Sequence, residues 1–151
     1  NHRDLTATEV GLSGTVRWRP VAAVQARLAR EIGDAAGAGD ATINSDTSYK
    51  QWTFAIKPTF SPTPDLDLGL RYEYERRDYT STLAADADHF ERQDRSNAVG
   101  LDGALTVAKK VRLRAAYDHI KRSVTTVAPA ANLDFGNYTE QRVTGGMDYR
   151  F

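Results

Sequence analysis

The feature that most constrains this chain is an alternation of polar and apolar residues with a period of two, which recurs in seven segments. Successive side chains of a β-strand point to opposite faces of a sheet, whereas a helix needs apolar residues three and four positions apart. Each segment therefore predicts a β-strand of roughly nine to eleven residues, the length that a tilted membrane strand requires. The predicted strands are 9–19, 24–32, 51–60, 66–75, 98–107, 111–118 and 142–151.

The connections between these segments alternate in length. Tight turns follow the first, third and fifth segments, at Arg19–Ala22, Ser61–Asp65 and Ala108–Lys110. Long polar loops follow the second, fourth and sixth, at Gly33–Thr47, Asp78–Asp94 and Lys121–Gly136. Short periplasmic turns and long outer loops are typical of outer-membrane barrels. The sequence thus predicts an all-β fold, an antiparallel up-and-down transmembrane β-barrel, and localisation in the bacterial outer membrane.

The aromatic residues of the apolar face agree with this orientation. Aromatic rings prefer the boundary between lipid and water, and barrels carry a girdle of them at each boundary. We expect the inner girdle to contain Trp18, Phe60, Tyr149 and Phe151. We expect the outer girdle to contain Trp52, Tyr72, Tyr74 and Tyr117.

The opposite face of the segments carries charges of both signs. Arg or Lys at the middle of a bilayer costs roughly 2–4 kcal/mol, so this face is expected to point into a barrel lumen. The wall would then tune the passage of charged or sugar-like solutes, or serve as an ion-pair lattice that stiffens the barrel. The predicted lumen-lining residues are Arg17, Arg27, Lys57, Arg71, Glu73, Asp102, Arg112, Arg114, Asp118, Arg142 and Asp148.

Composition excludes several other classes of protein. Twenty Lys and Arg residues balance twenty Asp and Glu residues, so no net field favours nucleic acid. There is no cysteine, which excludes disulfides and thiolate metal sites. The mean hydropathy of −0.54 is too low for a helical membrane protein.

The sequence predicts no enzyme, no cofactor and no metal site. The three histidines, His2, His89 and His119, do not have the spacing of metal ligands. Asp118 and His119 are adjacent, but neighbours on a strand point to opposite faces and cannot easily pair. We therefore expect His119 at the outer rim of the barrel and no catalytic residue.

Strand parity predicts that residues 1–151 form the C-terminal part of one larger barrel domain. The first and last predicted strands both run toward the periplasm, and an odd number of strands cannot close a bacterial single-chain barrel. At least one further strand is then expected upstream of Asn1, as part of an even-stranded barrel.

Several stretches resemble a known family. Gly14–Pro20 with Val24–Glu31 is similar to a strand–turn–strand unit of the beta-barrel porin type-two family, in which a tryptophan precedes a turn with proline. Leu70–Tyr79, Arg92–Ser96 and Ala115–Ser123 resemble the final strands of that family. The chain departs from the family in its longer Asp78–Asp94 loop. The ending Tyr149-Arg150-Phe151 resembles the signal by which the barrel-assembly machinery recognises its clients.

The resemblance implies an outer-membrane pore or export channel for small solutes, sugars or exopolysaccharide, with outer-membrane lipid, lipopolysaccharide and an exopolysaccharide-export system as partners. The charged strands are also similar to barrels that sheath multihaem cytochromes. TonB-dependent receptors, which carry a plug, end in comparable strands. These three alternatives stay open at the level of the sequence.

Six charged residues flank the second long loop: Arg76, Arg77, Asp78, Arg92, Asp94 and Arg95. Such a run either stays solvated or binds acidic groups of lipopolysaccharide or another polyanion.

Overall fold

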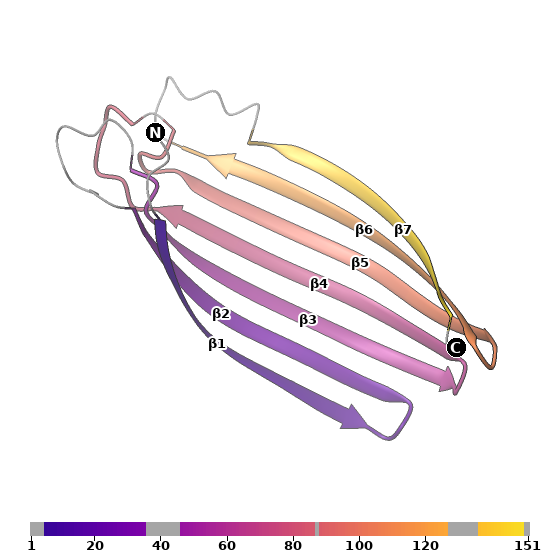
Figure 1. Ribbon diagram of the computed structural model, residues 1–151. Helices are drawn as coiled ribbons and strands as arrows, with labels where there is room; N and C mark the ends of the chain where they lie inside the picture. Colours follow the sequence, from indigo (N-terminus) through magenta and orange to yellow (C-terminus); the bar gives the residue numbers. More distant parts are fainter. Residues whose placement is uncertain (1–4, 36–45, 87, 127–135, 150–151) are drawn as a thin grey trace.

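The computed structural model describes residues 5–35, 46–86, 88–126 and 136–149. These residues form a single sheet of seven strands, each antiparallel to the next one along the chain (Figure 1). The strands are β1 (Leu5–Trp18), β2 (Ala22–Ala35), β3 (Tyr49–Thr63), β4 (Leu66–Tyr79), β5 (Gln93–Ala108), β6 (Val111–Thr125) and β7 (Tyr138–Tyr149). The predicted all-β class, the up-and-down order and the number of strands are confirmed.

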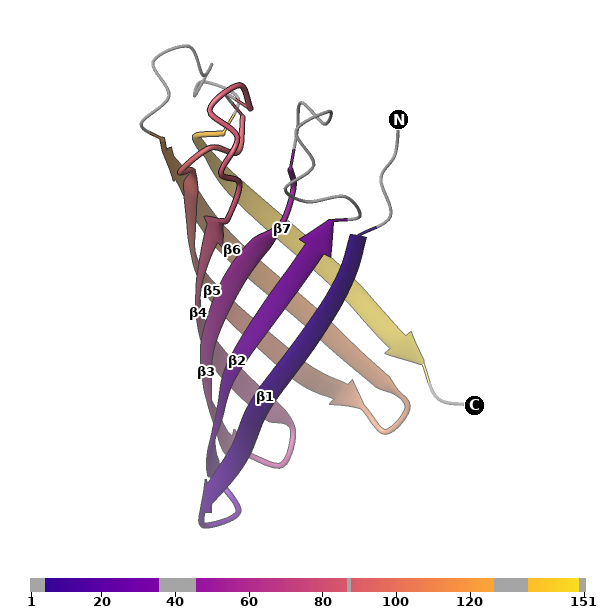
Figure 2. The same ribbon diagram turned by 90° about the vertical axis from the view of Figure 1, so that its left-hand side faces the viewer.

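The sheet is bent into an open gutter, as the two views in Figures 1 and 2 show. β1 pairs only with β2, and β7 pairs only with β6, so both outer strands keep one unpaired edge. The described residues therefore form an open sheet and not a closed barrel.

The strands are longer than the alternation predicted, and the long connections are correspondingly shorter. β2 continues past Gly33 to Ala35, and β6 continues past Lys121 to Thr125. The prediction was wrong here because it followed the alternation of apolar residues, whereas the backbone ladder continues where that alternation has ended. Gln93 of β5, for example, pairs in register with Thr125.

The short turns have local causes in the sequence. Pro20 lacks the backbone donor that a ladder needs, and Arg19 before it has a φ of 64°, a left-handed conformation. The other two tight turns follow register shifts, between Phe60 and Thr63 and between Thr106 and Ala108. Extra residues at these shifts end the pairing and let the chain reverse within a few residues.

The sheet has almost no hydrophobic core. Among the described residues, the buried hydrophobic side chains are Ala29, Ala35, Tyr49 and Val124. The accessible area is 10614 Å², whereas a compact protein of 16.7 kDa would expose about 7,600 Å². No helix in the described part of the chain is long and apolar enough to cross a membrane.

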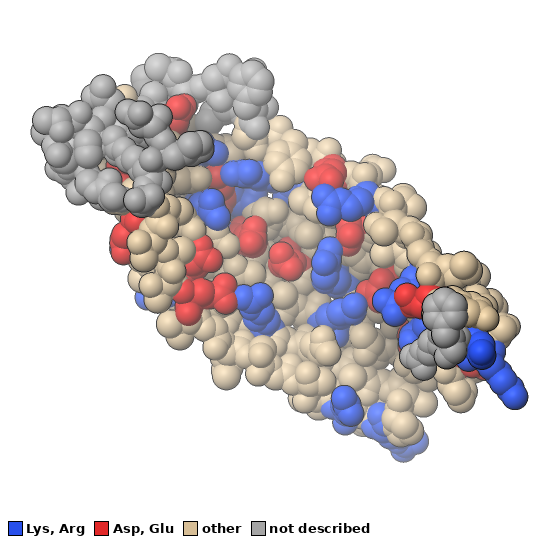
Figure 3. Space-filling view, viewed as in Figure 1, with Lys and Arg blue, Asp and Glu red and all other residues tan. Residues whose placement is uncertain are grey.

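Large apolar side chains instead lie exposed on one face of the sheet. They are most exposed on the two edge strands, where Leu12 is 78% and Val143 is 80% accessible. In the centre of the sheet, Leu101 of β5 is still 57% accessible. Along the middle of the strands the charged residues occupy the other face, which is the inside of the gutter seen in Figure 3. The sheet thus has a convex apolar face and a concave charged face.

Arg19, the turn residue with a left-handed conformation, allows a test of the turn geometry, because Gly and Val should have opposite effects on stability at this position. Arg19→Gly should raise the free energy of unfolding, and Arg19→Val should lower it, because a β-branched residue is strained at positive φ. The two variants should differ by about 1 kcal/mol in urea titrations in detergent micelles. Lys110, whose φ is not positive, is the matched control: there Val should be no worse than Gly. Equal stability of the two Arg19 variants would contradict the turn geometry.

Candidate functional site

The concave face of the gutter is the candidate site. Side chains alternate along each strand, so this face takes the odd-numbered residues of β1–β4 and the even-numbered residues of β5–β7. Figure 3 shows acidic and basic side chains interleaved over it. The register places all eleven predicted lumen residues on this face: Arg17, Arg27, Lys57, Arg71, Glu73, Asp102, Arg112, Arg114, Asp118, Arg142 and Asp148.

The middle of the concave face contains a hollow of about 590 Å³. It lies over β3 to β7, and its floor is formed by small residues such as Gly100 and Gly146. Charged side chains of both signs surround it: Lys57, Asp67, Arg71, Asp102, Arg112, Arg114 and Asp118. A polar solute in this hollow would meet hydrogen-bond donors and acceptors on every side.

Three ion pairs in the hollow join strands that are not neighbours. Lys57 Nζ of β3 lies 2.9 Å from Asp102 Oδ1 of β5. Arg71 Nη2 of β4 lies 2.7 Å from Asp118 Oδ1 of β6. Arg112 of β6 reaches back to Asp67 of β4. Strands two positions apart are separated by about 9.6 Å, so only a long Lys or Arg side chain can span the strand between them.

Glycines make room for two of these pairs. Gly100 of β5 stands between Arg71 and Asp118 in the register, and a Cβ at this position would overlap the Asp118 carboxylate. Gly69 of β4 is opposite Asp102, and its Cβ would lie 2.6 Å from Asp102 Oδ1. Sequence analysis missed this role of Gly69 and Gly100, since their importance appears only when the register is known.

The remaining charges pair with closer partners. Arg27 lies 2.5 Å from Glu9, and Arg114 lies 2.7 Å from Asp148. Arg142 lies 2.8 Å from Glu140 on its own strand. Arg17 and Glu73 form no ion pair within the described residues. Most of these side chains are a third or more exposed, so each pair contributes roughly 0.2–1 kcal/mol and the lattice stays open to solutes.

The predicted girdle residues lie on the convex face, but not all of them lie near strand ends. Trp18 and Phe60 share one cross-strand row at the short-turn end, and Tyr149 ends β7. Tyr72 and Tyr117 lie close to the middle of β4 and β6. The expected end position was wrong for these two because both strands continue through polar residues.

The other girdle positions divide as follows. Trp52 and Tyr74 lie toward the long-loop end of β3 and β4. Phe151, with the predicted contact to the assembly machinery, lies outside the described residues.

His119 and Asp118 point to opposite faces, as the adjacency argument predicted. Asp118 faces the hollow and binds Arg71, whereas His119 is paired in register with Val99 and Gln141 on the convex face. No cluster of three or more potential metal ligands occurs among the described residues.

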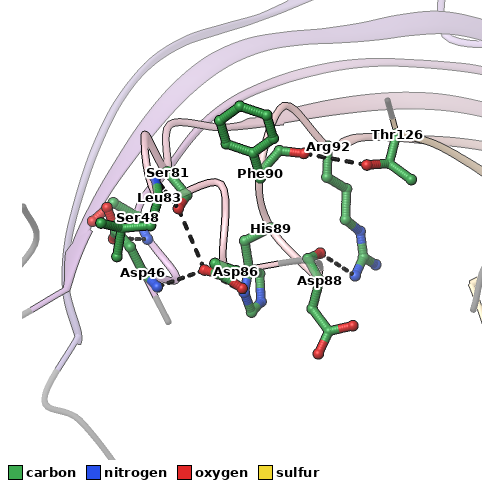
Figure 4. A network of polar contacts seen from close by, with 10 residues as sticks. All are labelled: Asp46, Ser48, Ser81, Leu83, Asp86, Asp88, His89, Phe90, Arg92 and Thr126. Carbon is green, nitrogen blue, oxygen red and sulfur yellow. Dashed lines mark hydrogen bonds and ion pairs between the residues drawn. The ribbon is translucent and has the colours of Figure 1, made fainter. Parts of the chain in front are cut away.

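A second polar cluster holds the connections at the long-loop end together (Figure 4). Asp86, in the β4–β5 connection, is buried, and its carboxylate accepts hydrogen bonds from the Asp46 backbone nitrogen at 2.6 Å and from Ser81 Oγ at 3.3 Å. His89 Nδ1 lies 2.9 Å from the same carboxylate. Thr126 Oγ1 donates to the Phe90 carbonyl at 3.2 Å. The β4–β5 connection is thereby tied to the connections on both sides.

A methyl group added at Gly100 should break the ion pair between Arg71 and Asp118, which crosses this glycine. In a double-mutant cycle, Arg71→Gln with Asp118→Asn should report a coupling free energy of roughly 0.2–1 kcal/mol, measured by urea unfolding in micelles. In a Gly100→Ala background this coupling should vanish, because the methyl group displaces the carboxylate. Gly146→Ala is the matched control on the same face, where a Cβ meets open space. Coupling that survives Gly100→Ala would contradict the geometry.

Comparison with known proteins gives no match to a family model, to a curated protein or to a solved structure. The similarity to the beta-barrel porin type-two family therefore stays a prediction.

Proposed function

We propose that this chain forms part of an outer-membrane β-barrel, with its convex face in lipid and its concave face lining a pore or export channel. The solutes in this proposal are small polar molecules, sugars or exopolysaccharide. One observation carries it: along the middle of its strands, a seven-stranded sheet exposes large apolar side chains on the outside of its curve and gathers charges on the inside.

The exposed apolar face is the first support for the proposal. A sheet in water normally buries one face against another layer, whereas the described residues form one sheet and no second layer. Val10, Leu70 and Leu105 belong to one continuous apolar surface across the strands. Each buried Å² of such surface is worth roughly 25 cal/mol, so this face strongly favours an apolar surrounding. Lipid chains provide that surrounding without a second protein layer.

The two open edges call for further strands. In lipid, an unpaired backbone amide or carbonyl costs several kcal/mol, so a spanning sheet must close on itself. β1 and β7 each offer a full unpaired edge. In our proposal these edges pair with additional strands, and the gutter becomes one side of a barrel wall.

The chemistry of the concave face fits a hydrated passage. The hollow offers guanidinium and ammonium donors beside carboxylate acceptors, and the two signs alternate. Such a wall suits a solute with many hydroxyl groups, which both donate and accept hydrogen bonds, better than it suits an ion of one sign.

A charge on the convex face tests whether this face lies in lipid. Leu101→Arg should lower the free energy of unfolding in phospholipid vesicles by about 2–4 kcal/mol. Thr144→Arg, on the concave face beside the hollow, should cost far less. In water an exposed leucine tolerates arginine, so a Leu101→Arg variant as stable as Thr144→Arg would contradict a lipid-facing surface.

Planar-bilayer recording of the complete polypeptide tests the pore. We expect stable open steps, and neutralising Arg112 and Arg114 to Gln should shift selectivity toward cations because Asp67 and Asp148 then lose their partners. Lys110→Gln, in a tight turn, removes the same type of charge and should leave selectivity unchanged. An inserted barrel without conductance would contradict the open pore and favour a lumen filled by a plug or a partner protein.

A further inference from the structure

The convex face changes character toward its long-loop end, where the register assembles a row of basic residues. Arg30 of β2 pairs with Trp52 of β3, Trp52 pairs with Arg76 of β4, and Arg76 pairs with Arg95 of β5. Four consecutive strands thus place three arginines and a tryptophan side by side. Two further cations lie in adjacent rows of the same face, and we call Arg30, Lys50, Arg76, Arg95 and Lys121 the outer basic patch.

The cations of the patch are mostly uncompensated within the described residues. All five side chains are exposed. Within the part of the chain that the structure describes, the one ion pair of the patch joins Arg76 Nε to Asp78 Oδ2 at 3.1 Å. Arg95 donates to the neutral side chain of Gln93 at 2.7 Å, and Arg30 lies over the Trp52 ring at 5.4 Å.

Two like charges are even placed directly opposite each other. Arg76 and Arg95 are register partners on the same face, an arrangement that destabilises a sheet unless an anion lies between or above them. A bound anionic group would relieve this repulsion. Among the described residues, the carboxylates on this face nearest the patch are Asp78 and Asp34, and two carboxylates do not balance five cations.

The sheet separates these cations from others that are near them in sequence. Arg77, Arg92 and Arg122 belong to the concave side, where Arg77 donates to Gln51 and the other two bind Asp94. The run of charges around the β4–β5 connection is therefore two groups. One is an internal polar network, and the other faces outward, where Asp78 is the one carboxylate that pairs with it within the described residues.

The patch borders directly on the apolar surface. The next row toward the middle of the strands contains Leu28, Phe54 and Tyr74, which pair in register across β2, β3 and β4. A ligand that fits both rows carries negative charge at one end and hydrocarbon at the other. Arginine guanidinium groups bind phosphate in a bidentate geometry, and a tryptophan ring prefers the boundary between headgroup and chain.

We propose that the outer basic patch binds the phosphate groups of an anionic lipid headgroup, with Arg30, Arg76 and Arg95 as the principal donors and Trp52 at the headgroup boundary. This inference rests on the proposed function, since it requires the convex face to meet lipid. It goes beyond that function by assigning a lipid class and a site to one end of the sheet.

The test uses Trp52 as a reporter. The chain has two tryptophans, so Trp18→Phe leaves Trp52 as the single tryptophan in these 151 residues. Any tryptophan elsewhere in the complete polypeptide is also changed to Phe, and excitation is at wavelengths that tyrosine does not absorb. The complete polypeptide in zwitterionic micelles is titrated with diphosphoryl lipid A, and Trp52 emission gives the dissociation constant. Neutralising Arg30, Arg76 and Arg95 together to Gln should weaken binding on the order of a hundredfold.

A matched triple variant controls for overall charge. Arg19, Lys109 and Lys110 lie in turns at the opposite end of the sheet, and their change to Gln removes the same number of cations. This variant should bind lipid A as the parent does, and excess inorganic phosphate should not displace the lipid. Equal loss in both triple variants would overturn the site, and displacement by inorganic phosphate would assign the patch to soluble anions.

Insertion is measured separately in phosphatidylcholine vesicles, so that the two proposals can fail independently. A chain that inserts there but does not prefer diphosphoryl lipid A over phosphatidylcholine overturns the lipid site alone. A chain that does not insert at all overturns the barrel and the lipid site together.

Discussion

Backbone hydrogen bonding between neighbouring strands is the interaction on which this structure depends, because the described residues have almost no buried core to share that task. The ladder fixes the register, and the register decides which side chains share a face. In a compact domain, a slipped strand would be corrected by packing against a second layer. Here a shift of the register by one residue would place the charged side chains of a strand on the apolar face and its apolar side chains on the charged face. The different environments of the two faces therefore disfavour the shifted register.

Much of the fold could be predicted because alternation is a strong local signal. The parity of the apolar residues placed all eleven lumen candidates on one face, and the prediction of opposite faces for Asp118 and His119 is confirmed. Strand ends were predicted less well. Alternation indicates where one face of a strand is apolar, whereas pairing continues through segments such as Lys121–Thr125, in which Val124 is the one apolar residue and no alternation is visible.

The contacts inside the site could not be predicted in the same way. The pairing of Lys57 with Asp102 depends on which strand lies between them and on the absence of a side chain at Gly69. Likewise, Arg76 and Arg95 are far apart in the chain and become neighbours only through the β4–β5 register. Such relations join residues across two or three strands, and a local pattern holds no information about them.

The strand-spanning ion pairs also have a mechanical consequence. An ion pair between β4 and β6 spans the concave face above β5, like a chord across an arc. The length of this ion pair limits how far the three strands can flatten. Arg71 with Asp118 and Arg112 with Asp67 are two such chords over the same three strands. A wall tied in this way favours a tighter radius than the backbone alone requires. Solution conditions that weaken charge pairing, such as high salt, would then act on the curvature of the sheet as well as on the charge of its concave face.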